Sequence, residues 1–289
     1  MTIILRWLGN AGFEFKMDGL TVIVDPFLTR PKAHQVYFGR VAPDQAALRK
    51  HIPHCDHILV THAHFDHCMD APEITMRTGA IVHGSANTCA ILSAAGVPLN
   101  QIHNISAGDS FYIGNIRVSV LPAAHPWLPG YYYAKPNPAM KFPARLRDYR
   151  MDACFSYLLE CAGRRILIWS STSSAGAPRA DLLTCRAISS QGWYAELLGQ
   201  VKPKVVIPQH WDDFFQPLSA NPRPFFASPR LGFPPIARID LGEFKNRIIK
   251  ASPGCRVLLP EIFRSYEIDF FANSDTDTHR QCFMVDKHR

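Results

Sequence analysis

One short segment limits what this chain can fold into more than any other: four residues with metal-ligating side chains fall within six positions. An apolar run at 57–60 leads into it, and it reads Thr61-His62-Ala63-His64-Phe65-Asp66-His67. In extended backbone, His62 and His64 point to the same side because residues i and i+2 share a face. Asp66 and His67 follow where the chain turns toward a helix, so they can face a second point. Imidazole and carboxylate groups suit Zn²⁺, Mn²⁺ and Fe, and the segment therefore predicts a metal site rather than a histidine-rich surface loop.

Two more histidines follow apolar runs elsewhere in the chain. The run at 118–121 leads to His125, and the run at 205–207 leads to His210. Sites in layered α/β folds tend to lie at such strand ends. A lone histidine is more often a core or surface residue, but these two would complete two sites of three ligands each. We therefore include both as candidate metal ligands.

The order of the predicted elements favours stacked sheets with helices on their outer faces over strict alternation of strands and helices. β-rich runs closed by Gly, Asp or Pro predict strands at 2–8, 13–16, 21–24, 57–60, 80–83, 110–113, 116–121, 155–160, 165–169 and 205–207. Capping residues and spacing predict helices at 44–51, 85–95, 189–200 and 240–250. The segments 126–149 and 217–235 are irregular, and neither reads as a linker between two cores.

Length and ligand spacing together favour a single large domain. A chain of 289 residues with 47% hydrophobic residues can bury a core without disulfides, and this composition excludes collagen, coiled coil and wholesale disorder. The candidate ligands span residues 62 to 210, so one domain must include most of the chain. We expect a domain at 1–271 and a polar C-terminal tail at 272–289.

The chain shows no pattern typical of export or of a membrane span. It has no basic segment ahead of its apolar start and no run of ~20 apolar residues. The eight cysteines contain no C-x-x-C pair, which favours reduced thiols in a cytoplasmic protein. The net charge of +7 would permit nucleic-acid binding, but no stripe of aromatic and basic residues accompanies it. We expect no nucleic-acid or membrane partner, and a homo-oligomer stays open.

Five stretches carry a resemblance to a known family over about residues 1–215. They are 7–13, 22–26, 56–67, 124–125 and 208–211. Together they resemble the metallo-β-lactamase superfamily and, within it, the metal-dependent hydrolases that are similar to L-ascorbate-6-phosphate lactonase. The resemblance implies a four-layer αβ/βα sandwich with the metals at one rim, between the two sheets.

The resemblance also implies a role for each candidate residue. His62, His64 and His125 would hold a first metal, and Asp66, His67 and His210 a second. Asp25 would fix the ligand loop. The implied cofactor is one or two zinc ions, with Mn or Fe as alternatives. The implied activity is hydrolysis by a metal-activated hydroxide, with Asp66 orienting the water or moving its proton.

The sequence departs from the family pattern at one position. The family usually has an acidic residue after the strand that corresponds to 165–169, and its carboxylate bridges the two metals. Here that position falls near Ser171 or Thr172. A neutral hydroxyl neutralises two cations less well than a carboxylate does. We therefore expect weaker binding of one metal, or a mononuclear site.

The substrate is less constrained than the metal site. The resemblance favours a small anionic ester, lactone or phosphorylated compound, and Arg145, Arg147 and Tyr132 are candidate substrate contacts in an aromatic and basic segment. A phosphodiesterase or ribonuclease of the same fold is one alternative. A degenerate scaffold that binds a ligand or partner without catalysis is another. Asp212 and Asp213 lie close to His210 in sequence and could offer a spare carboxylate.

Overall fold

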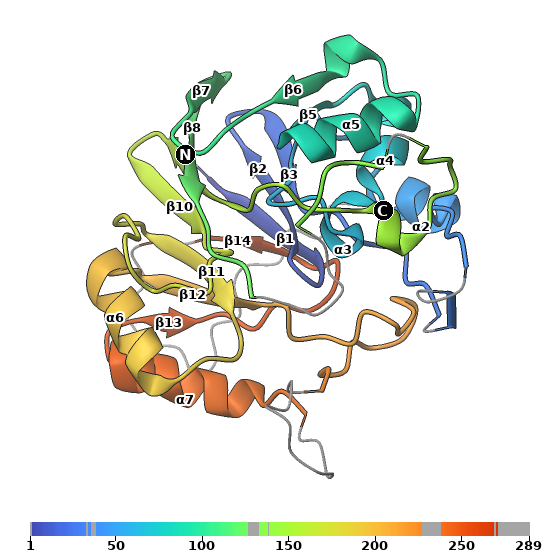
Figure 1. Ribbon diagram of the computed structural model, residues 1–289. Coiled ribbons are helices and arrows are strands. Elements are labelled where there is room, and N and C mark those ends of the chain that lie inside the picture. The colour runs from blue at the N-terminus through green and yellow to red at the C-terminus, as the bar shows by residue number, and fades with distance from the viewer. Residues whose placement is uncertain are drawn as a thin grey trace, which may run out of the picture.

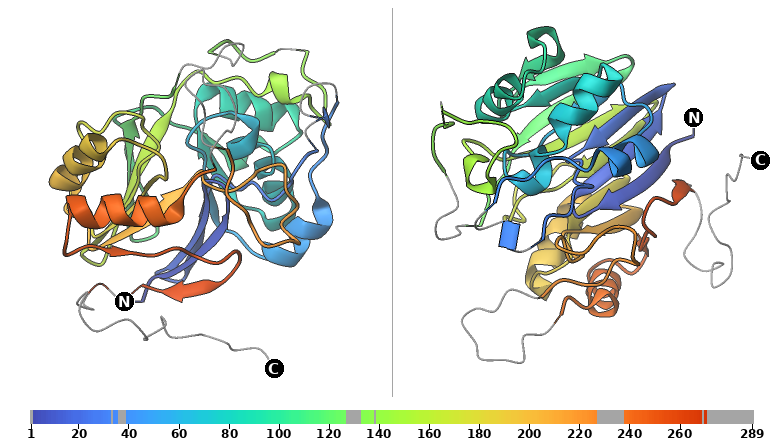
Figure 2. Two further views of the ribbon diagram at one scale, coloured as in Figure 1. Left: turned by 90° about the horizontal axis from the view of Figure 1, so that it is seen from below. Right: turned by 90° about the vertical axis from the view of Figure 1, so that its right-hand side faces the viewer.

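Two seven-stranded sheets pack face to face in the computed structural model, which describes residues 2–32, 34–35, 39–126, 133–137, 139–226, 238–268 and 270 (Figure 1). The first sheet has the order β14-β1-β2-β3-β4-β5-β6 and the second β13-β12-β11-β10-β9-β8-β7. Helices cover the outer face of each sheet, as the turned views show (Figure 2). The predicted αβ/βα sandwich is confirmed.

Each sheet joins an antiparallel part to a parallel part. The first sheet contains β1 (Ile4–Gly9), β2 (Gly12–Met17), β3 (Leu20–Val24), β4 (His57–Leu59), β5 (Ile81–Gly84), β6 (Ile102–Asn104) and β14 (Ser265–Glu267). The second contains β7 (Ser110–Ile113), β8 (Ile116–Pro122), β9 (Phe155–Cys161), β10 (Arg164–Ile168), β11 (Leu182–Arg186), β12 (Val205–Gln209) and β13 (Arg256–Val257). Strands β3 to β6 run parallel, as do β10 to β13. The connections between parallel strands carry the helices.

The four predicted helices are present and begin at side-chain caps. They are α2 (Gln45–His51), α5 (Ala86–Ala94), α6 (Gln191–Val201) and α7 (Leu241–Ala251), capped by Asp44, Ser85, Ser190 and Asp240. Two further helices, α3 (Phe65–Cys68) and α4 (Ala71–Thr78), were not predicted. Helix α3 is a single turn inside the ligand segment, so its sequence has no room for helical periodicity. Strands β6, β11, β13 and β14 were also missed, because β6, β13 and β14 have only two or three residues and β11 lacks a run of β-branched residues.

Two hydrophobic cores hold the layers together. Phe13, Phe15 and Leu159 belong to the core between the sheets, whereas Ile58 and Val82 pack beneath the helices of the first sheet. Adjacent strand residues face opposite sides of a sheet. Because the first sheet is covered by the second sheet on one face and by helices on the other, a parallel strand such as β4 is apolar on both faces. Burying each large apolar side chain contributes about 1.5–3 kcal/mol. The two cores meet at the end of β4, where the ligand segment begins.

The remaining expectations for the chain concern its ends and membranes. Residues 272–289, predicted as a polar tail, lie outside the described residues, and the domain limit at 271 stays a prediction. Across the part of the chain that the structure describes, no helix has both the length and the apolar character to cross a membrane.

Candidate metal centre

The segment after β4 presents its four polar side chains to the space between the two sheets. His64 has extended backbone, with φ −66° and ψ 154°, and is the residue from which α3 starts. Asp66 and His67 lie in that single helical turn. His62, His64 and His67 are all buried, with exposed fractions of 2–4%. Imidazoles held this far from water lose hydration, so they need partners or a ligand that can replace it.

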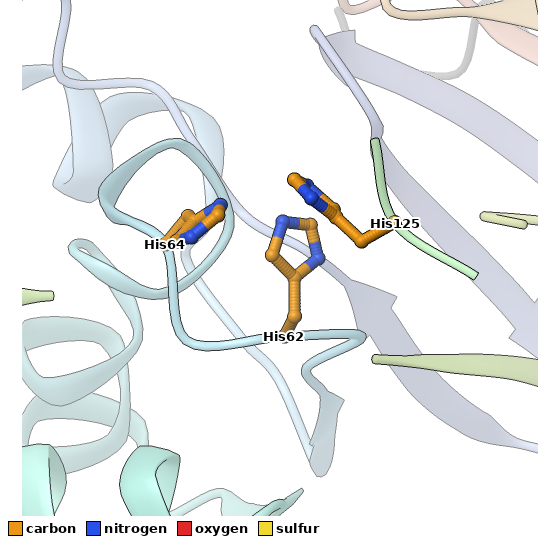
Figure 3. A group of neighbouring side chains, drawn as sticks. All are labelled: His62, His64 and His125. Carbon is orange, nitrogen blue, oxygen red and sulfur yellow. The ribbon is translucent and has the colours of Figure 1, made fainter. Parts of the chain in front are cut away.

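His125 joins His62 and His64 from the other sheet. It follows β8, and the three rings point toward one another across the gap between the sheets (Figure 3). One ligand atom from each residue lies within 4.8 Å of the other two. The Nδ1–H of His125 donates to Pro126 O at 2.9 Å, which leaves Nε2 to face the group. We call these three residues the first ligand group.

Asp66, His67 and His210 form a second ligand group beside the first. The Nε2 atoms of His67 and His210 are 2.9 Å apart. Asp66 Oδ2 lies 3.4 Å from His67 Nε2 and 4.0 Å from His210 Nε2. His210 follows β12 and has a positive φ of +57°. The structure thus brings all six predicted ligand positions together into the two sets of three that the sequence suggested.

Asp25 ties the ligand segment to the end of β3. Its carboxylate accepts hydrogen bonds from Thr61 N at 2.7 Å, from Thr61 Oγ1 at 2.6 Å and from His67 Nδ1 at 2.7 Å. Asp25 is fully buried, with φ +44°. The bond to Nδ1 fixes the ring orientation of His67 and leaves its Nε2 for the second ligand group. Asp25 therefore has the contacts expected of a residue that fixes the loop.

Charge differs sharply between the two ligand groups. In the first group, burial lowers the pKa of His64 to about 4 and also lowers that of His62 and His125, so all three rings are neutral. In the second, burial opposes the charge of His67, but the carboxylates of Asp66 and Asp25 outweigh it and raise its pKa to about 10. Burial likewise opposes ionisation of Asp66, yet the charge and hydrogen bond of His67 hold its pKa well below the usual range. A cation bound at the second group would displace the proton of His67.

The hydroxyls at the position of the expected bridging carboxylate lie beside His125 but are already engaged. Ser171 Oγ accepts hydrogen bonds from Ala124 N at 3.0 Å and Ser173 N at 3.1 Å. Thr172 Oγ1 donates to Ala124 O at 3.1 Å. Both residues therefore hold the loop that carries His125. Within the residues that the structure describes, Asp66 supplies the single carboxylate of the two ligand groups.

The other predicted residues are not part of the two ligand groups. Arg145 and Arg147 are exposed, at the short 3-10 helix Leu146–Asp148, and Tyr132 lies outside the described residues. Asp212 is paired with Arg30 at 3.0 Å and Asp213 with Arg223 at 3.0 Å, so neither carboxylate is spare.

Cys68, His51 and His54 lie near the ligand segment in the sequence but are not part of the two ligand groups. The thiol of Cys68 is buried, and burial raises its pKa far above the usual range. His51 stacks on Phe263 with ring centroids 3.7 Å apart, and His54 contacts Asp56 at 3.1 Å. These side chains point to different parts of the molecule and do not form a site together.

Two residues near the ligand groups were not predicted as site residues from the sequence. Asn10, in the turn between β1 and β2, donates to Asp66 from its side-chain amide. Arg186 is the last residue of β11 and is paired in register with Gln209, the residue before His210. The side chain of His210 is 38% exposed, yet loss of hydration in the site and the charge of His67 lower its pKa to about 3, and the nearby charge of Arg186 acts in the same direction. The glycines on either side of the turn could have indicated a role for Asn10, whereas no local sequence pattern indicated one for Arg186.

The donor set fits a borderline divalent cation. Three imidazoles, or two imidazoles and a carboxylate, are common ligand sets for catalytic metal sites, in which an open position is left for water. Each ligand group here supplies three such donors, and the nitrogen atoms that turn away from the group in His67 and His125 have their own hydrogen-bond acceptors. These contacts are the ones that set imidazole tautomers around a metal.

The sandwich and its two convergent ligand groups are those of the metallo-β-lactamase superfamily. The chain belongs to the β-lactamase superfamily domain family, whose model matches residues 21–173. It is 34% identical over 271 residues to a UPF0173 metal-dependent hydrolase of Carboxydothermus hydrogenoformans, covering 89% of this chain and 96% of that protein.

A further relative and a solved structure agree with this family. A UPF0173 metal-dependent hydrolase of Methanopyrus kandleri is 34% identical over 122 residues, covering 42% of this chain and 46% of that protein. The chain thus spans about half the length of the first curated relatives it matches. Among solved structures, the metallo hydrolase Igni18 of Ignicoccus hospitalis superposes with a TM-score of 0.59 at 19% identity, covering 93% of this chain and 99% of that one. This likeness is one of fold.

Proposed function

We propose that the protein is a metal-dependent hydrolase in which a bound divalent cation would activate water for attack on a carbonyl or phosphoryl centre. The observation that carries this proposal is the convergence of six ligand side chains into two adjacent groups of three. His62, His64 and His125 would hold the first metal, and Asp66, His67 and His210 the second. A divalent cation bound there would lower the pKa of its water from ~15.7 toward ~7 and so supply hydroxide at neutral pH.

The chain's own residues then perform the remaining work. Asp66, which is ionised in the folded protein, would accept the proton of the attacking water or orient that water. Asp25 keeps His67 in one orientation, and Pro126 O does the same for His125. A site with fixed donors loses little energy to reorganisation when charge develops on the substrate.

Zinc is the metal that we propose, as one or two ions, with Mn or Fe as alternatives. Zinc accepts three imidazoles and an open position without a geometric preference of its own. Without a bridging carboxylate, Asp66 would be the single anionic ligand of two neighbouring cations. The cations would then repel each other more strongly than they would across a bridging carboxylate. Since Ser171 and Thr172 are engaged in loop hydrogen bonds, we expect the second ion to bind more weakly than the first.

The proposed substrate is a small anionic ester, lactone or phosphorylated compound, as for the lactonase-like hydrolases that the sequence resembles. The donor groups carry little negative charge, so bound cations would leave the site attractive to an anion. Arg186 is half-buried, next in register to the strand that leads to His210, and a guanidinium can grip a carboxylate or phosphate with two hydrogen bonds. It is a nearer candidate for this contact than the exposed Arg145 and Arg147. We propose a cytoplasmic protein for this role.

Two alternative functions would each give a different experimental result. A phosphodiesterase or ribonuclease of the same fold would bind RNA with a steep dependence on salt concentration. A scaffold without catalysis would follow from the missing bridging carboxylate, and it would bind no metal. The six intact ligand positions favour a hydrolase over a scaffold.

Metal analysis joined to a hydrolysis assay tests the proposal. Protein purified without chelators should contain at least one equivalent of metal, and the loaded protein should cleave members of a panel of anionic esters, lactones and phosphate esters. Ser171→Asp, which offers the expected carboxylate, should tighten binding of the second ion, while Ser173→Asp, at an exposed position two residues away, controls for added charge nearby. Metal-free protein with full activity would contradict the metal mechanism, loaded protein with no activity on the panel would contradict hydrolysis of these substrates, and protein that binds no metal would favour the scaffold.

A further inference from the structure

The turn between β1 and β2 reaches into the second ligand group through one side chain. Asn10 is fully buried, and its Nδ2 donates to Asp66 Oδ2 at 3.2 Å and to Asp66 O at 3.1 Å. Oδ2 is the same oxygen that faces His67 and His210. The amide therefore fixes both the backbone and the ligand oxygen of Asp66.

The backbone of the same residue fixes a second ligand. Asn10 O accepts a hydrogen bond from His210 N at 3.2 Å and another from Trp7 Nε1 at 3.3 Å. The indole of Trp7 stacks on Trp211, the residue after His210, with ring centroids 4.8 Å apart. Asn10 thus connects two ligands that lie 144 positions apart in the chain.

A buried ion pair between Asp212 and Arg30 holds the backbone of Asn10 in place. Asp212 accepts from Asn10 N at 2.8 Å and from Arg30 Nη2 at 3.0 Å, and both charged side chains are almost fully buried, with exposed fractions of 1% and 2%. Gly9 is required by this packing, because a Cβ there would lie 2.1 Å from Arg30 Nη2. Asn10 itself has φ +52°, a conformation that asparagine tolerates better than most residues.

We propose that Asn10 is a positioning residue for the second metal: it sets the spacing between Asp66 and His210 so that a cation can bind there without a bridging carboxylate. The inference rests on the second metal position of the proposed function, and not on hydrolysis. It gives a role to the turn Gly9-Asn10-Ala11-Gly12, which the proposed ligand set leaves unexplained. A residue that orients a metal ligand typically changes metal affinity by about 10–100-fold when it is removed.

Asn10→Gly is the sharpest test, because glycine keeps the positive φ and the backbone bonds to Asp212 and His210 while removing the amide. Titration with Co²⁺, followed by its d–d spectrum, and with Zn²⁺ by calorimetry, should show the second ion weakened by about 10–100-fold and the first unchanged. Lys202→Gly is the matched control, since Lys202 is exposed at the end of α6 with φ +51°. It should bind both ions as the unchanged protein does.

A second variant separates metal positioning from backbone stability. Asn10→Ala removes the same amide, so it should weaken the second ion relative to the first as much as Asn10→Gly does. Because alanine is strained at positive φ, this variant should also have a lower Tm. Equal affinities in Asn10→Gly and the unchanged protein would overturn the inference, as would equal weakening of both ions or an unchanged protein that binds one ion only. Failure of the proposed function is a different result: two ions bound as expected, and no hydrolysis.

Discussion

Strand β4 connects two histidine clusters that behave in opposite ways. At its first residue, His57 Nδ1 lies 3.0 Å from His83 Nε2, and His83 Nδ1 lies 2.8 Å from His103 Nδ1. These three rings, which we call the histidine row, come from neighbouring strands β4, β5 and β6. After its last residue, β4 leads into the segment of the two ligand groups. In the histidine row each ring is hydrogen-bonded to the next, whereas in each ligand group three ligand atoms face one common position.

The difference lies in where the second nitrogen of each ring goes. His83 gives both of its nitrogens to other imidazoles, and its ring stacks on Phe111 with centroids 4.6 Å apart. His67 gives Nδ1 to the carboxylate of Asp25 and keeps Nε2 for its ligand group. Accordingly, burial lowers the pKa of His83 to about 3, while carboxylates overcome burial and raise that of His67 to about 10. Histidine content alone therefore does not identify a metal site; His67 and His125 differ from His83 because their second nitrogen meets a carboxylate or carbonyl oxygen rather than another imidazole.

The largest expected effect breaks the first ligand group. His62→Ala with His64→Ala should remove the metal of that group and reduce hydrolysis to the background rate, because one imidazole cannot hold the cation alone. Metal content measured by mass spectrometry and the hydrolysis rate check this outcome. Circular dichroism should show the fold retained. A double variant that kept its metal and activity would contradict the ligand assignment.

A smaller effect is expected from the carboxylate behind His67. Asp25→Asn keeps the shape and suits the positive φ of this position, but it replaces the anion that orients the ring. Metal affinity should fall by about 10–100-fold, mainly at the second ligand group. Asp18→Asn is the matched control, because Asp18 also has a positive φ but lies in an exposed turn. Unchanged affinity in Asp25→Asn would show that the anion behind the ring is not what separates the two clusters.

The smallest effect concerns the histidine row and appears in stability. The pKa of His83 is depressed in the folded protein by burial and by the charges of His57 and His103, so the unfolded chain binds the extra proton between about pH 6.5 and pH 3. The stability that neutral His83 contributes is therefore full above pH 6.5 and is lost as the pH falls, by up to ~1.4 kcal/mol per pH unit.

His83→Phe tests this contribution while preserving the stack on Phe111. The free energy of unfolding of the metal-free variant, measured by urea denaturation, should change less steeply with pH between 4 and 6 than that of the unchanged protein. Metal binding should not change. His34→Gln, at an exposed position, should leave the slope as it was. An equal slope in His83→Phe, or loss of metal, would remove the distinction between the row and the ligand groups.

Much of the fold was predictable from local patterns. The caps at Asp44, Ser85, Ser190 and Asp240 gave four helices, and alternating apolar runs gave most of the strands. Helices α3 and α4 and strands β6, β11, β13 and β14 were missed, because short elements carry little periodicity. The metallo-β-lactamase resemblance supplied the pairing of the sheets, which local patterns alone left open.

The sequence by itself determined the segment from His62 to His67, because its ligands are neighbours whose spacing already sets their directions. Only the tertiary structure decided which distant residues join them. His125 and His210 meet that segment through the packing of two sheets, Asn10 reaches Asp66 from the first turn of the chain, and the histidine row forms from three separate strands. Contacts of this kind depend on strand order and register, and these are set by burial over the whole domain rather than by any local run of residues.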